Sequence, residues 1–123
     1  MDQRAKILIV DDEESIRFTF EIFLAEAGYD VTTARSYKEG LAVLDQEKFD
    51  LILTDIILGG KTGLDLVREI RRRSMSCPVV IFTGFPSGES ASDAARMGVV
   101  DYLVKPVRMD KLLQVTRDAL SRK

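Results

Sequence analysis

Five short apolar runs recur along the chain and are separated by longer amphipathic stretches. The runs are Lys6–Val10, Asp30–Ala34, Leu51–Thr54, Val79–Thr83 and Asp101–Val104. Most of them are apolar without alternation, as in Ile7-Leu8-Ile9-Val10, which is typical of strands that are covered on both faces. The pattern therefore predicts five strands of a buried parallel sheet.

The stretches between these runs carry helical patterns. In the first stretch Ile16, Phe20 and Leu24 share one helical face, and Gly28 stands where a C-terminal cap is expected. Helix starts with capping-box spacing or a looser version of it are predicted at Ser36 with Glu39, Thr62 with Asp65, and Ser90 with Asp93. We expect the helix that Ser90 opens to end near Met97-Gly98, and a last helix to span the apolar positions from Leu112 to Leu120.

Strands that alternate with helices predict an α/β fold, a (βα)5 doubly wound sheet of five parallel strands. With 123 residues the chain holds one domain, residues 1–123. Ligands of such sheets bind beyond the carboxyl ends of the strands, where the strand order reverses. The residues that follow each strand are therefore the first candidates for a functional site.

Polar residues close the predicted strands. Asp11 and Asp12 follow the first strand, Asp55 the third and Lys105 the fifth, and Thr83 ends the fourth. Carboxylates that meet at one edge repel one another, so a divalent cation or a shifted protonation must relieve the repulsion. Mg²⁺ binds carboxylate, water and phosphate oxygens. Together with a lysine and a hydroxyl, the set predicts phosphoryl transfer to an aspartate.

The composition excludes several other chemistries. The chain has no histidine, which excludes a Ser-His-Asp triad, His-ligated zinc and a phosphohistidine of its own, and the single cysteine excludes an internal disulfide. Eighteen basic and 20 acidic residues give a net charge of -2, with no general attraction for nucleic acid or membrane. Because no signal core or apolar run of about 20 residues is present, we expect a soluble, cytoplasmic protein.

The chain resembles the receiver domain of two-component response regulators, of the chemotaxis and nitrogen-regulation type. The resemblance covers about Lys6 to Ser121 and rests on four segments in order, which are Ile7–Glu13, Asp55 with Gly63, Thr83-Gly84, and Asp101–Pro106. It implies a flavodoxin-like fold with the strand order 2-1-3-4-5. It also implies a signalling module that promotes its own phosphorylation and dephosphorylation and is not a turnover enzyme.

The resemblance further implies how the phosphoryl group is accepted. Asp55 would take it from the phosphohistidine of a sensor histidine kinase. Mg²⁺ would be bound directly by Asp12, mainly through water by Asp11, and by the backbone carbonyl of Ile57 together with Asp55. Lys105 would pair with the phosphoryl oxygens.

A switch is implied by the same resemblance. Thr83 would move to hydrogen-bond the phosphoryl group, Tyr102 would turn inward in response, and the Lys105-Pro106 peptide bond would be cis. The surface of the fourth helix, fifth strand and fifth helix would then act on a downstream effector or output domain, and is a candidate homodimer surface. The chain is interpreted either as a single-domain regulator or as the N-terminal part of a longer transcriptional regulator.

One departure from the family pattern and two variable positions change the expectations. Leu58-Gly59 stand where most members have Met-Pro, and with Gly60 they are expected to loosen the loop. Ile57 and Phe85 are both apolar at variable positions beside the site. Apolar bulk there should hinder an attacking water molecule, which predicts a long-lived phosphorylated state.

Several alternatives stay open at this stage. A small Mg²⁺-dependent phosphohydrolase with an aspartate nucleophile needs the same residue types, and steady turnover of p-nitrophenyl phosphate would favour it. A flavin- or nucleotide-binding domain is a third class, although Asp11-Asp12 would repel phosphate. Structural interpretations also compete, because Asp11–Glu14 could simply be an acidic helix start, and Arg71–Arg73 a solvated helix end rather than a nucleic-acid patch.

Overall fold

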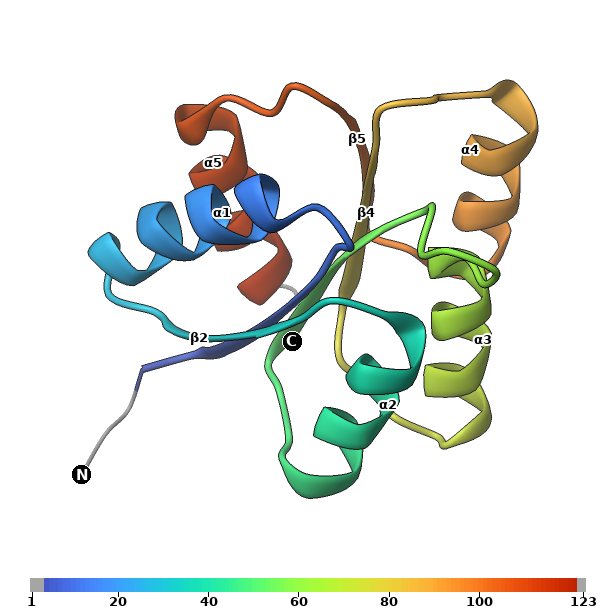
Figure 1. Ribbon diagram of the computed structural model, residues 1–123, viewed down its shortest axis with the longest axis horizontal. Helices are drawn as coiled ribbons and strands as arrows, with labels where there is room; N and C mark the ends of the chain where they lie inside the picture. Colours follow the sequence, from blue (N-terminus) through green and yellow to red (C-terminus); the bar gives the residue numbers. More distant parts are fainter. Residues whose placement is uncertain (1–3, 122–123) are drawn as a thin grey trace.

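Five parallel strands form the central sheet of the computed structural model, which describes residues 4–121 (Figure 1). The strands are β1 (Lys6–Val10), β2 (Asp30–Ala34), β3 (Leu51–Asp55), β4 (Val79–Thr83) and β5 (Asp101–Val104). They lie in the order β2-β1-β3-β4-β5, and each hydrogen-bonded pair is parallel. The predicted fold class and strand order are confirmed, and β3 extends one residue further than expected, to include Asp55.

Helices follow each strand and cover both faces of the sheet. They are α1 (Glu14–Glu26), α2 (Tyr37–Gln46), α3 (Gly63–Arg72), α4 (Gly88–Arg96) and α5 (Met109–Leu120). The helices α1 and α5 lie on one face, and α2, α3 and α4 lie on the other (Figure 1). None of the described helices is long and apolar enough to span a membrane.

Two of the predicted helix starts are found where expected. The Ser36 hydroxyl caps α2 by accepting a hydrogen bond of 3.0 Å from the backbone N–H of Glu39. At the start of α3, Thr62 and Asp65 form a complete capping box, in which each side chain accepts from the backbone N–H of the other residue. The hydrogen bond from Thr62 N–H lowers the pKa of the Asp65 carboxyl, with further help from Arg68 and Lys61. These local bonds fix the chain direction as it leaves the sheet edge.

The predicted start of the fourth helix was wrong. The helix α4 begins at Gly88, and its N-terminal cap is Ser87, whose hydroxyl accepts from the backbone N–H of Ser90. Ser90 therefore lies in the first turn, because a serine three residues before it offers the same capping chemistry. The predicted end near Gly98 agrees with the structure, where this glycine has a φ of 78°.

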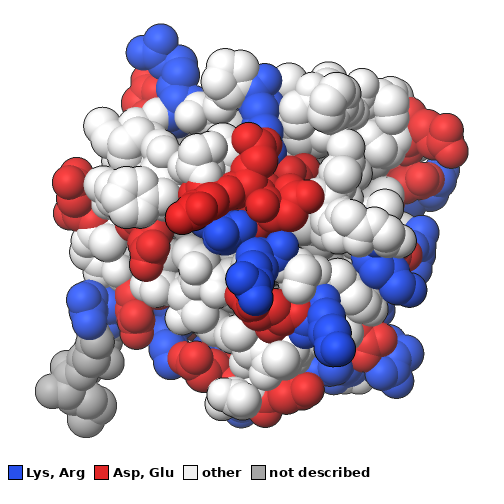
Figure 2. All heavy atoms as spheres, viewed as in Figure 1, with Lys and Arg blue, Asp and Glu red and all other residues white. Residues whose placement is uncertain are grey.

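One concentration of acidic side chains stands out on the surface. Figure 2 shows the face seen in Figure 1, with a concentration of Asp and Glu where the carboxyl ends of β1 and β3 meet α1. Elsewhere on this face the positive and negative side chains are interspersed. The position agrees with the rule that sites of such sheets lie where the strand order reverses, between β1 and β3.

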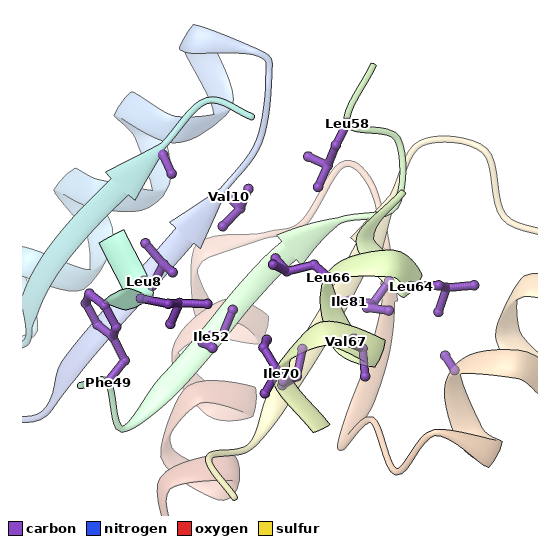
Figure 3. Packing of buried hydrophobic residues seen from close by; sticks show 14 residues of the cluster. Leu8, Val10, Phe49, Ile52, Leu58, Leu64, Leu66, Val67, Ile70 and Ile81 are labelled. Carbon is purple, nitrogen blue, oxygen red and sulfur yellow. The ribbon is translucent and has the colours of Figure 1, made fainter. Parts of the chain in front are cut away.

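Alternate residues of each central strand pack on opposite faces of the sheet. In β1, Ile7 and Ile9 pack with α1 and α5, whereas Leu8 and Val10 pack with α2 and α3. Figure 3 shows the cluster on the side of α2, α3 and α4, in which Leu8 and Val10 lie near side chains of β3 and α3. Because both faces are buried, the strands read as continuous apolar runs in the sequence.

Gly63 stands at the point where α3 packs against the end of β3. A Cβ atom at this position would lie 2.3 Å from the carbonyl oxygen of Asp55 and 3.2 Å from Cα of Ile56. Both neighbours are backbone atoms, so no side-chain movement could make room. The glycine eight residues after Asp55, one of the family motifs, is therefore required by close packing.

We expect Gly63→Ala to destabilise the fold by about 1 to 3 kcal/mol, because the added methyl group must displace backbone. The matched control is Gly88→Ala at the start of α4, where a Cβ would meet no atom within 4 Å. Chemical denaturation of both variants measures the effect. A loss of stability that is equal in the two variants would contradict the packing explanation.

Candidate functional site

The alternation of side chains places three charged residues on the same side of the sheet. Asp11 and Asp55 lie two residues after Ile9 and Leu53, which pack with α1 and α5. Lys105 lies two residues after Leu103, which belongs to the same cluster. Backbone hydrogen bonds from Asp11 N–H and Lys105 N–H to the neighbouring strands continue the extended pairing as far as these residues. The strand geometry therefore aims all three side chains at one point.

The Lys105 ammonium group lies among three carboxylates. Its Nζ atom is 2.8 Å from Asp55 Oδ2, 3.1 Å from Asp11 Oδ2 and 3.3 Å from Glu13 Oε1. The side chains of Asp11 and Asp55 are buried, and that of Lys105 is only 12% exposed. The Phe82 ring lies under the ammonium group, with its centroid 5.5 Å from Nζ. The structure thus brings together the predicted Asp11, Asp55 and Lys105.

Burial and charge shift the ionisation of this cluster. Loss of solvation raises the pKa of Asp11 to about 6, and repulsion from Asp55 adds to the rise. The backbone N–H of Glu13 and the Lys105 ammonium act in the opposite direction. Burial would lower the pKa of Lys105, but the hydrogen bond to Asp55 and the close negative charges of Asp11 and Asp55 outweigh it and hold this pKa above its usual value. Lys105 therefore remains a fixed positive charge beside two crowded carboxylates.

Three carboxylates at this edge of the sheet have the arrangement of a cation site. Asp11, Asp12 and Asp55 each offer one oxygen, and these oxygens lie within 4.8 Å of one another. Asp11 Oδ2 is buried and accepts no hydrogen bond from the described residues, so the ion pair with Lys105 alone leaves it incompletely satisfied. An all-oxygen set with one exposed member, Asp12, suits Mg²⁺, which keeps several of its waters.

Ile57 contributes to the site through its backbone. Its N–H donates to Asp55 Oδ1 over 3.2 Å, and this is the carboxylate oxygen that Lys105 does not bond. The Ile57 side chain is 45% exposed. The role expected for its carbonyl oxygen in binding a cation stays a prediction.

The two predicted switch residues lie on the other side of the sheet. Thr83 is buried, and its hydroxyl accepts from the N–H of Phe85 over 3.0 Å. The Tyr102 hydroxyl lies 2.6 Å from the Ser90 hydroxyl of α4. Within the described residues neither side chain has a hydrogen bond to the carboxylates, so their proposed movement stays a prediction. The Lys105-Pro106 bond is cis.

The loop after β3 is closed by hydrogen bonds. Gly59 and Gly60, which were expected to loosen it, both have positive φ values, of 53° and 71°. They permit a turn in which Leu58 N–H donates to the carbonyl of Lys61 over 3.1 Å. Leu58 is 3% exposed and points from this loop toward the core (Figure 3). The glycines thus shape a turn that is anchored at Leu58.

Sequence reasoning missed the parts that Glu13 and Arg17 take in the site. Glu13 is the N-terminal cap residue of α1, but its side chain makes no capping bond and reaches Lys105 instead. The guanidinium of Arg17 donates to the backbone carbonyl of Asp11 over 2.7 Å. The sequence did offer one sign of the role of Glu13. Glu is seldom an N-terminal cap, so a glutamate at that position suggests another partner for its carboxylate.

The arginines at the end of α3 are paired within the chain, as the helix-end interpretation expects. The Arg71 guanidinium donates to the carbonyls of Met75 and Cys77. Arg72 and Arg73 both bond Glu69, and these two bonds lower the pKa of Glu69 to about 2. These contacts within the chain place the three arginines at the end of the helix, where positive charge is favourable.

We expect Asp11→Asn to stabilise the cation-free protein by up to about 3 kcal/mol at pH 7. Between pH 4 and 6 the folded protein holds the Asp11 proton and the unfolded chain does not, so the native protein loses stability as pH rises through this range. The difference in free energy of unfolding between Asp11→Asn and the native protein should therefore be small at pH 4 and reach its full value above pH 6.

Urea denaturation in the presence of a chelator measures this difference. Asp12→Asn, which removes the exposed neighbouring carboxylate, is the matched control and should change stability by about 0.5 kcal/mol or less. If the extra stability of Asp11→Asn over the native protein decreases as pH rises, the raised pKa of Asp11 is contradicted.

Comparison with known proteins supports the family resemblance. A family model for the response regulator receiver domain matches residues 7–117. The response regulator protein PilR of Pseudomonas aeruginosa is 42% identical over 117 residues, which are 95% of this chain and 26% of that protein. The DNA-binding transcriptional regulator NtrC of Salmonella typhimurium is 37% identical over 119 residues, 97% of this chain and 25% of that protein. The chain thus spans about a quarter of these relatives.

Solved structures agree with the fold. A CheY-like receiver domain protein from Methanospirillum hungatei has a TM-score of 0.93 and 31% identity, and the match covers 98% of this chain and 96% of that one. The chemotaxis response regulator CheY4 of Vibrio cholerae has a TM-score of 0.88 and 33% identity, over 95% and 99% of the two chains. From its motifs, its strand order and these matches, the chain belongs to the receiver domain family of two-component response regulators.

Proposed function

We propose that Asp55 accepts a phosphoryl group from the phosphohistidine of a sensor histidine kinase. The observation that carries this proposal is the position of Lys105, whose ammonium lies 2.8 Å from Asp55 Oδ2 in a nearly buried site. An ammonium at this distance can neutralise charge on a group attached to Asp55. The family membership supports the same reaction.

In the proposed reaction an Asp55 carboxylate oxygen attacks phosphorus. The new O–P bond forms as the N–P bond of phosphohistidine breaks, and the electron pair of that bond leaves with the imidazole. Asp55 Oδ1 is oriented by the N–H of Ile57, and Asp55 Oδ2 by Lys105. Mg²⁺, when bound by Asp11, Asp12 and Asp55, would supply positive charge to the phosphoryl oxygens.

Membership of the receiver family makes the chain a signalling domain rather than a classical enzyme. The phosphohydrolase alternative is accordingly not favoured. Since the acceptor is part of the chain, the expected chemistry is one covalent modification per molecule, followed by its loss to water. Turnover of an external phosphate ester is not needed to explain the site.

We also propose that the signal passes to an output domain or effector through α4, β5 and α5. The strand β5 of this surface includes Tyr102 and the half-exposed Val104, and β5 is an edge strand of the sheet. The matched relatives include proteins named as transcriptional regulators, which are about four times as long as this chain. The same surface remains our proposal for a homodimer contact, because an exposed edge strand with an apolar residue can pair with a second copy.

The direct test is incubation with acetyl phosphate and Mg²⁺, followed by intact-mass measurement. We expect one phosphoryl adduct in the native protein and none in Asp55→Asn or when a chelator removes the metal. Asp50→Asn, which changes the aspartate just before β3 and at the opposite end of that strand from Asp55, is the control and should still be modified. An adduct that persists in Asp55→Asn would rule out the proposed acceptor.

The apolar side chains beside the site lead to a second prediction. Ile57 and Phe85 are 45% and 77% exposed at the loops that follow β3 and β4. We expect them to hinder an attacking water molecule, so that the phosphorylated form lasts minutes or longer. The double variant Ile57→Asn with Phe85→Glu should lose the phosphoryl group faster.

Loss of the adduct after removal of acetyl phosphate gives the decay rate by intact-mass measurement. Ile22→Asn changes a partly exposed apolar residue on α1 and should leave the decay unchanged. Decay of the native phosphoprotein within seconds would contradict the explanation.

A further inference from the structure

Glu13 occupies an unusual position for its residue type. It is the N-terminal cap of α1, with a φ of -88° and a ψ of 115°, yet its carboxylate caps no backbone N–H of the helix. Its own N–H donates to Asp11 Oδ1 over 2.8 Å, which fixes the backbone beside the site. From there the side chain reaches Lys105, which is 92 residues away along the chain.

The Lys105 ammonium group donates hydrogen bonds to Asp55 and Glu13 and forms an ion pair with Asp11. Asp55, Asp11 and Glu13 each lie within 3.3 Å of Nζ. A further oxygen that approaches Nζ therefore competes with these carboxylates for the ammonium group. Asp11 and Asp55 are buried, and separation from Lys105 would leave their charges without that partner.

Glu13 differs from the other two in its exposure. Its side chain is 59% exposed, so its carboxylate can move into water at little cost. It also lies outside the group of three carboxylates whose oxygens are close enough to share a cation. Of the three partners of Lys105, Glu13 is the one that can be exchanged.

We infer that Glu13 is a positioning residue that accepts a hydrogen bond from Lys105 until a phosphoryl oxygen replaces it. This inference rests on the proposed phosphorylation of Asp55. In the unmodified protein Glu13 competes with the incoming phosphoryl group for Lys105. The strength of that competition sets part of the rate of phosphorylation and part of the affinity for a phosphoryl analogue.

Three variants separate the contact from the charge. Glu13→Gln removes both the charge and the ion pair. Glu13→Asp keeps the charge but is one methylene shorter, so its carboxylate falls short of Lys105. Glu14→Gln removes the adjacent exposed charge, for which no contact with Lys105 exists among the described residues.

The test measures the rate of phosphorylation by acetyl phosphate and the affinity for beryllofluoride, both at saturating Mg²⁺. We expect Glu13→Gln and Glu13→Asp to increase both by about two- to fivefold, the range for an exposed ion pair. Glu14→Gln should stay close to the native protein. Thermal denaturation of each variant shows whether the fold is retained.

The outcomes distinguish this inference from the function on which it rests. Suppose that the native protein is phosphorylated and that Glu13→Asp has the native rate and affinity. If Glu13→Gln then has the same rate and affinity as Glu14→Gln, only the charge of Glu13 matters, and the inference is overturned. Weaker Mg²⁺ binding in Glu13→Gln than in Glu14→Gln would assign Glu13 to the metal site and would also overturn it. Absence of any phosphoryl adduct in the native protein would overturn the proposed function and the inference together.

Discussion

The ion pair between Lys105 and the buried carboxylates of Asp11 and Asp55 is the interaction on which the site depends. Two aspartates that are almost removed from water repel each other, and the ammonium 2.8 and 3.1 Å away offsets that repulsion. The offset is incomplete, since the pKa of Asp11 still rises to about 6. The protein therefore carries a destabilised carboxylate at the place where a divalent cation would relieve it.

Successive side chains of a strand point to opposite faces of the sheet, so the residues at its carboxyl edge lie on two sides. Asp11, Asp55 and Lys105 lie toward α1 and α5. Thr83, two residues after Ile81, and Tyr102 lie toward α2, α3 and α4. The sides meet at the backbone, where Lys105 N–H donates to the carbonyl of Thr83 over 2.8 Å. Asp55 is paired with Phe82 of β4, and β4 is paired with β5, whose Tyr102 contacts Ser90 of α4.

Much of this arrangement follows from the sequence by simple physics. Continuous apolar runs predict two-sided burial, and strand alternation places Asp11 and Asp55 together once the strand order is known. Other features depend on contacts between distant segments and have no local pattern. The Glu13 contact with Lys105 needs the completed edge, and capping propensity could not choose Ser87 over Ser90 because both are serines. The close approach at Gly63 likewise appears only when α3 is packed on β3.

A crystal structure of the protein with Mn²⁺ and beryllofluoride tests the central claim most directly, because anomalous scattering locates the metal. The account predicts one metal ion bound by Asp12 and Asp55 and bound directly or through water by Asp11, with beryllofluoride on Asp55 and in contact with Lys105. A metal ion bound elsewhere, or beryllofluoride that is absent from Asp55, would contradict it.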